Sequence, residues 1–78
     1  MNIIEAYTHL DFGGKIKRKG WEIYYKACKE EDLVNMYNCC DNSLVDIYEL
    51  DSIADVMDIL KSFMSIEDIL ADDWEVVE

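Results

Sequence analysis

The sequence contains no proline, only three glycines, and only seven basic residues against eighteen acidic ones. So little glycine and proline, together with 51% apolar residues, excludes a low-complexity chain and predicts a folded domain. The net charge of −11 argues against direct nucleic-acid binding, which needs a positive face to displace counterions from phosphate. A run of about 18 apolar residues, the length that spans a membrane, is also missing. The first residues lack the basic segment of a signal peptide. We therefore expect one cytoplasmic domain over residues 1–78, with no membrane partner.

Cysteine and histidine are also scarce. The three cysteines, Cys28, Cys39 and Cys40, are an odd number without a Cys-x-x-Cys pair, and His9 is the single histidine. This predicts free thiols in a reducing compartment and neither a metal site nor a cofactor. A Cys–His catalytic pair would have to use His9, and no Gly-x-Ser-x-Gly or P-loop pattern occurs. We expect a protein that is not an enzyme.

Acidic residues are concentrated in the second half of the chain. Residues 1–40 hold six acids and six bases, whereas residues 41–78 hold twelve acids and a single base, Lys61. Four of the seven bases lie within residues 15–19. This distribution predicts a small basic ridge on a broad acidic body. Paired acids such as those at 67–68 and 72–73 fit a cation site or a glycosidase dyad, but capping and solvation are the commoner roles of acids beside short helices.

Periodicity and turn signals predict an α+β fold. Asn2 and Glu5 form a capping-box pattern ahead of an amphipathic helix over residues 3–11. Ser52, with Asp55 at the third position, predicts the cap of a second helix, and Ser65 the cap of a third. The expected architecture is a small antiparallel sheet of four to five strands with an N-terminal helix and two short helices in the C-terminal half. The expected strands cover residues 15–19, 21–28, 33–40, 44–50 and 74–77.

Simple hairpins would align Tyr25, Met36 and Ile47 across three strands of this sheet. The opposite face would then carry Tyr24, Tyr37, Tyr48 and several aliphatic residues. Both faces are apolar in this register, which is unusual for an antiparallel sheet with one wet side. The face with Tyr25, Met36 and Ile47 can pack on the helices. The other requires a further helix, a second subunit or a planar ligand to cover it.

The segment Gly14-Lys15-Ile16-Lys17-Arg18-Lys19-Gly20-Trp21 combines groups that suit an anionic planar ligand. Arg18 and Lys19 can donate to phosphate oxygens, and Gly20 lets a ligand approach the backbone. Trp21 offers a flat face for stacking on a base. The alternative is a solvated edge strand followed by a core tryptophan.

This segment and the chain end, Ile66-Glu67-Asp68-Ile69-Leu70-Ala71-Asp72-Asp73-Trp74-Glu75-Val76-Val77-Glu78, resemble the two ends of a family of small phage and prophage proteins. The family, once a domain of unknown function, is the second type of Thoeris anti-defence protein. The resemblance implies an α+β homo-oligomer that sequesters a cyclic ADP-ribose-type or related cyclic-nucleotide messenger without cleaving it. One relative is instead a type II-A anti-CRISPR that inhibits Cas9. The residues that match the family motifs, and so are implied to bind ligand, are Arg18, Lys19, Gly20, Trp21, Asp73 and Trp74; Trp74 is equally a core candidate.

Three functions therefore remain open. The first is sequestration of a nucleotide second messenger in the host bacterial cell. The second is an acidic inhibitor in which residues 41–78 imitate phosphates toward a basic host defence protein. The third is a phage assembly protein held together by the second apolar sheet face.

Overall fold

The computed structural model describes residues 1–50 and 55–77, and it begins with the expected helix. Helix α1 spans Ile3–Asp11, as predicted. The capping box is present, because the Asn2 side chain accepts from the Glu5 N–H at 2.9 Å and Glu5 Oε1 accepts from the Asn2 N–H at 3.3 Å. Gly13, with φ of 88°, ends the helix in the left-handed region that glycine adopts at low cost.

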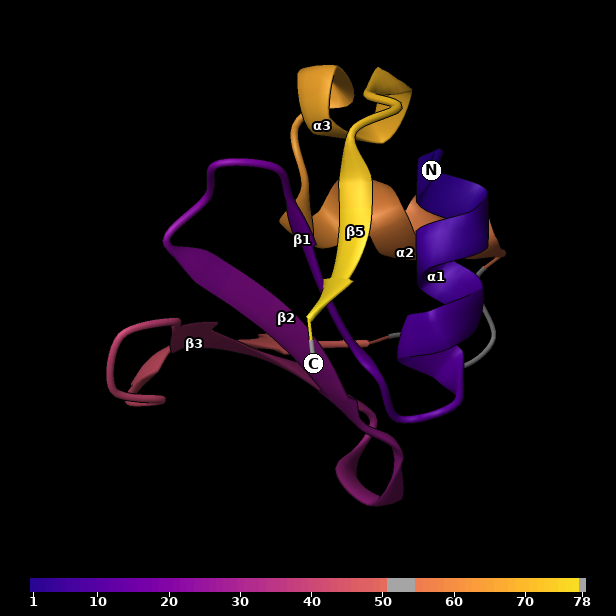
Figure 1. The fold of residues 1–78 in the computed structure, drawn as a ribbon. Coiled ribbons are helices and arrows are strands. Elements are labelled where there is room, and N and C mark those ends of the chain that lie inside the picture. Colours follow the sequence, from indigo (N-terminus) through magenta and orange to yellow (C-terminus); the bar gives the residue numbers. More distant parts are fainter. Residues whose placement is uncertain (51–54, 78) are drawn as a thin grey trace.

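Five antiparallel strands form one sheet in the order β4-β3-β2-β1-β5, which confirms the predicted α+β class (Figure 1). Strands β1 and β5 lie side by side although they come from opposite ends of the chain. A short 3-10 helix lies between the second and third strands. The bounds are β1 (Lys15–Arg18), β2 (Ile23–Cys28), η1 (Lys29–Glu31), β3 (Leu33–Asn38), β4 (Leu44–Glu49) and β5 (Trp74–Val77).

Two short helices stand between β4 and β5, as predicted. Helix α3 (Ile66–Leu70) is capped by Ser65, whose side chain accepts from the Asp68 N–H. Helix α2 spans Val56–Phe63. The expected cap, Ser52, lies outside the described residues. The prediction that Asp55 is the third residue of the helix is wrong. Asp55 is the N-cap, because its carboxylate accepts from the Asp58 N–H at 3.0 Å.

None of the described helices is long and apolar enough to cross a membrane.

The core lies between the helices and one face of the sheet, here called the inner face. This face is marked by four buried residues, one from each of four strands: Ile16, Tyr25, Val34 and Trp74. Helices α1 and α2 contribute Leu10, Leu60 and others to the same cluster. Strand alternation assigns the intervening residues to the opposite, outer face, on which none of the described helices packs.

The predicted register is right between β2 and β3 and wrong between β3 and β4. Tyr25 pairs with Met36 as expected, but Met36 pairs with Asp46, and Ile47 pairs with Asn35. An irregularity in the β3–β4 ladder between Met36 and Tyr37 leaves the pairs from Met36 to Leu33 one residue from the predicted register. Because side chains alternate along a strand, a one-residue offset exchanges their faces.

Because of this offset, the faces predicted for the side chains of β4 are wrong. Tyr48 points into the core, where its ring centroid lies 5.7 Å from that of Phe63 and 6.4 Å from that of Tyr25. Ile47, expected inside, is 47% exposed. The outer face therefore carries two tyrosines, Tyr24 and Tyr37, rather than three.

Candidate functional site

The fold brings together the two segments that the sequence singled out. Strand β1 pairs with β5 so that Arg18 and Trp74 are Cα partners. Beyond the strand end, the Lys19 N–H donates to the Asp73 carbonyl at 3.0 Å. All six residues predicted to bind ligand thus lie around one corner of the sheet.

Arg18 directs three of its five side-chain N–H groups to carboxylates of the protein. Its Nε donates to Asp73 Oδ1 at 2.8 Å and its Nη2 to Asp73 Oδ2 at 3.3 Å, while Nη1 donates to Asp68 Oδ1 at 3.0 Å. The bonds to Asp73, then those to Asp68, raise the pKa of Arg18 further above its ordinary value. The Arg18 hydrogen bond in turn lowers the pKa of Asp73. A phosphate at Arg18 would compete with two carboxylates, so this side chain ties β1 to α3 and β5.

The two tryptophans of the corner lie at different depths. Trp74 is 2% exposed, and its Nε1 donates to the Asp68 carbonyl at 2.9 Å. Trp21 is partly buried and rests edge-on against Trp74, with ring centroids 5.4 Å apart, and against Tyr25 at 6.0 Å. Trp74 is therefore a core residue that supports Trp21, and Trp21 keeps an accessible portion.

A tight turn joins Arg18 to Trp21. The Trp21 N–H donates to the Arg18 carbonyl at 3.1 Å, and Gly20 has a φ of 86°. The position that a Cβ of Gly20 would occupy has nothing within 4 Å, so the turn is open on that side. Lys17 Nζ donates to the Trp21 carbonyl at 3.0 Å and lies 3.3 Å from Glu75 Oε1.

Lys19 supplies an accessible cation at this turn. Its side chain is exposed, and no carboxylate among residues 1–50 and 55–77 lies within salt-bridge distance of it. The corner thus offers a supported indole, an open glycine turn and an ammonium group. These groups can hold a planar anion by stacking and charge.

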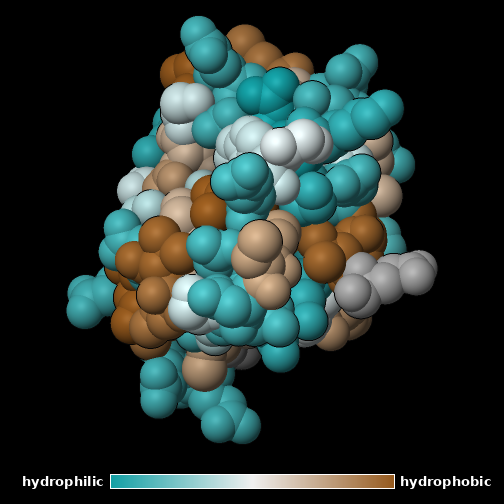
Figure 2. Space-filling model, turned by 60° about the vertical axis from the view of Figure 1, so that its left-hand side comes forward, coloured by the Kyte–Doolittle hydropathy of each residue, from teal (hydrophilic) through white to brown (hydrophobic). Residues whose placement is uncertain are grey.

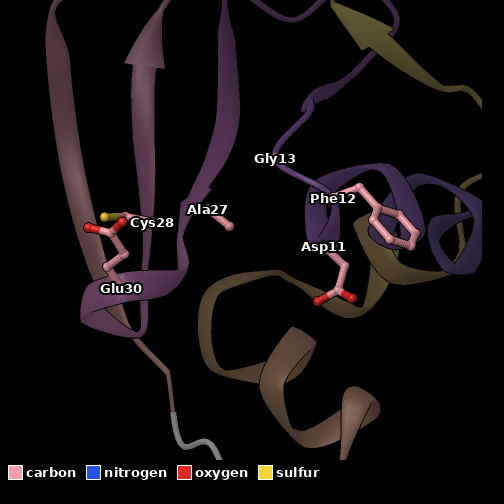
Figure 3. Close-up of a pocket in the computed structure, with 6 residues that line it drawn as sticks. All are labelled: Asp11, Phe12, Gly13, Ala27, Cys28 and Glu30. Carbon is pink, nitrogen blue, oxygen red and sulfur yellow. The ribbon is translucent and has the colours of Figure 1, made fainter.

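Sequence reasoning missed a hollow of about 440 Å³ at the other end of β1 (Figure 3). Asp11, Phe12 and Gly13 line it from the end of α1, and Ala27 and Cys28 from β2. Phe12 is 86% exposed. The available signal was Phe12 itself, an aromatic residue beside Gly13-Gly14 and outside the apolar stripe of the helix.

A family model described as Tad2-like, the Thoeris anti-defense 2-like domain, matches residues 1–77. Searches among curated proteins and among solved structures give no match.

Proposed function

We propose, because this chain belongs to the Thoeris anti-defense 2-like family, that it sequesters a cyclic-nucleotide immune messenger without cleaving it. The family indicates a phage anti-defence role. The messenger class is a cyclic ADP-ribose isomer or a cyclic dinucleotide. Sequestration needs affinity rather than chemistry, so the protein requires no general acid, base or cofactor. The observation that carries the proposal is the placement of Trp21 on Trp74 beside an open turn.

Each group of the corner has a role in this proposal. Trp21 stacks on a base, and Lys19 neutralises a phosphate. Gly20 leaves room for the ligand because a Cβ there would project into open space. Arg18 and Asp73 are positioning residues, since their mutual hydrogen bonds fix the strand ends from which the turn projects. Trp74 supports the stacking ring from below.

The overall charge of −11 is compatible with an anionic ligand. Interactions between exposed charges are screened over about 8–10 Å at physiological salt, so nearby cations dominate distant acids. At the turn, Glu75 pairs with Lys17, and Asp68 and Asp73 pair with Arg18, so Lys19 is the cation left for a ligand. The described acids of residues 41–50 and 55–58 belong to β4, the turn before it and the start of α2.

We further propose that the protein is a homo-oligomer with a subunit interface along strand β4, at the edge of the sheet opposite β5. Strand β4 is an edge of the sheet, and three of its apolar residues are exposed: Leu44 at 52%, Val45 at 52% and Ile47 at 47%. An exposed apolar edge strand pairs readily with another chain. Light scattering after size-exclusion chromatography would show a multiple of 9.1 kDa; a monomer at micromolar concentration would contradict this part.

Calorimetry with cyclic ADP-ribose isomers and cyclic dinucleotides tests the proposal. A sequestering protein needs a submicromolar Kd, about −8 kcal/mol or better. Trp21→Ala should weaken binding by tenfold or more, because stacking on an aromatic side chain contributes about 1–3 kcal/mol per base. Phe12→Ala removes a more exposed ring at the far end of β1 and should change the Kd by less than twofold. Absence of heat and of thermal stabilisation with every nucleotide would reject the proposal.

The exposed acidic residues support a second candidate function, inhibition of a basic host defence protein. Seven acids of the described C-terminal half are exposed, and such a surface can imitate phosphates toward a basic groove. Pull-down against a basic defence nuclease at rising salt tests this alternative, since an electrostatic mimic releases steeply with salt. The exposed acids are Asp41, Asp46, Glu49, Asp55, Asp58, Glu67 and Asp72.

A further inference from the structure

The outer face of the sheet carries a cluster of cations and aromatic rings that the corner at Trp21 does not use. We infer that this face is an anion-binding surface, in which Lys15 and Lys26 hold the phosphate groups of a phosphorylated small molecule. That the molecule is a nucleotide rests on the proposed function, whereas the anion site itself rests on the geometry of this face.

Lys15 and Lys26 are Cα partners across β1 and β2. Directly opposed side chains in an antiparallel pair have Cβ atoms about 4.5–5.5 Å apart, and like charges placed so are destabilising. No carboxylate of the described residues lies within salt-bridge distance of either ammonium. The pair therefore presents two uncompensated positive charges, which a bridging phosphate would neutralise.

A rigid aromatic floor positions one of these lysines. Lys15 Nζ lies 5.3 Å from the centroid of the Tyr24 ring, within the range of a cation–π contact. Tyr24 is only 4% exposed although it is outside the core cluster, because it stacks on Tyr37 with centroids 5.3 Å apart. Its hydroxyl donates to Asn42 Oδ1 at 2.9 Å. The Tyr24 ring, over which the Lys15 ammonium lies, is thus held by stacking on Tyr37 and by the hydrogen bond of its hydroxyl group.

Polar groups beside the lysines extend the surface across β3. Asn35 is the Cα partner of Lys26, and its Nδ2 donates to the Tyr37 hydroxyl at 3.0 Å. Asn35 Oδ1 is buried and accepts no hydrogen bond from the described residues. A buried acceptor without a donor is unfavourable, so a ligand hydroxyl that reached Asn35 Oδ1 beside the two lysines would relieve this cost.

Lys15 and Lys26 differ from Arg18 in their charged partners. Arg18 is bonded to two carboxylates, whereas Lys15 and Lys26 are bonded to none of the described ones. Figure 2, turned so that the left-hand side of Figure 1 comes forward, shows hydrophilic and hydrophobic residues interleaved rather than one continuous apolar surface. Such a surface suits a small charged ligand better than a second copy, which would have to bury both ammonium groups.

The test is a ¹⁵N-resolved NMR titration with inorganic pyrophosphate, repeated with ADP-ribose and cyclic ADP-ribose. We expect saturable shifts of the amides of Lys15, Tyr24, Lys26 and Asn35. The double variant Lys15→Gln/Lys26→Gln should weaken pyrophosphate binding at least tenfold. Lys61→Gln, which removes one positive charge on the exposed side of α2, should alter it less than twofold. Circular dichroism checks that each variant is folded.

The outcomes separate this inference from the proposed function. If pyrophosphate moves these amides but no nucleotide binds, the anion surface stands and the proposed function fails. If a nucleotide binds through Trp21 and pyrophosphate moves none of these amides, the function stands and the anion surface is wrong. An absence of shifts, or an oligomer that buries Lys15 and Lys26 between copies, also overturns the inference.

Discussion

The guanidinium of Arg18 donates two hydrogen bonds to the carboxylate of Asp73, a residue 55 positions later in the chain. This pair joins the first strand to the segment before the last one, at the corner where the two sequence motifs meet. Its third partner, Asp68, belongs to α3, so a single side chain holds three segments. The turn that leads to Trp21 begins at Arg18, because the Arg18 carbonyl accepts from the Trp21 N–H.

Replacing Arg18 with lysine should therefore weaken both stability and ligand binding. Lysine keeps the charge but loses the planar fork that engages Asp73 through two nitrogens. We expect a fall of a few degrees in the midpoint of thermal unfolding and weaker binding of the messenger. Lys19→Arg, the reverse exchange at the next position, should leave the midpoint unchanged. Equal midpoints for Arg18→Lys and wild type would show that the bidentate geometry contributes nothing.

Stability should depend on Asp73 in acid. Arg18 lowers the pKa of Asp73 in the folded state below its ordinary value of 3.8, so the unfolded chain binds more protons between the two values. The contribution of Asp73 is therefore complete above the ordinary pKa and is lost as pH falls through the lowered one. Urea unfolding of wild type and Asp73→Asn should differ most near neutral pH and converge toward pH 2. A constant difference across this range would contradict the assignment.

The two tryptophans should respond differently to truncation. Trp74→Ala removes a buried indole and should cost about 3–5 kcal/mol of unfolding free energy, enough to threaten a chain of this size. Trp21→Ala should cost less, because its ring is only partly buried, while binding falls tenfold or more. Chemical denaturation and calorimetry on both variants measure the two effects. If Trp21→Ala also unfolds the protein, Trp21 is a core residue and the binding role fails.

Gly20 should resist substitution for a backbone reason. Its φ of 86° is in a region that costs a side chain about 1–2 kcal/mol, although a Cβ would meet no neighbouring atom. Gly20→Ala should lower the unfolding free energy by roughly this amount and weaken binding by crowding the open side of the turn. Gly20→Asn should be milder in stability, since asparagine tolerates positive φ. An alanine variant as stable as wild type would argue that the turn rearranges freely.

Local signals predicted most of the fold. Helix α1 begins at its capping box and ends at its glycine pair, and α3 begins at Ser65, because each boundary is decided by a few adjacent residues. The exchange of faces in β4 was not predictable in this way. It depends on an irregularity between Met36 and Tyr37, a feature of strand pairing rather than of either strand alone.

The sequence predicted which residues lie at the corner of the sheet, but it did not predict which of them bond to each other. The motif residues do meet at one corner, yet the sequence did not reveal that Arg18 is occupied by Asp68 and Asp73, since these partners are about fifty residues away. The lysine pair on the outer face was equally hidden, because Lys15 and Lys26 become neighbours only through the register of β1 and β2.

Recovery of an intact ligand tests the central claim most directly. The protein would be incubated with a cyclic ADP-ribose isomer at equal concentration, the unbound fraction removed by filtration, and the protein then heat-denatured to release what it holds. We predict that the filtrate is depleted of messenger and that the heated sample returns it chemically unchanged. A filtrate that keeps all of the messenger, or a released product that has been hydrolysed, would contradict sequestration.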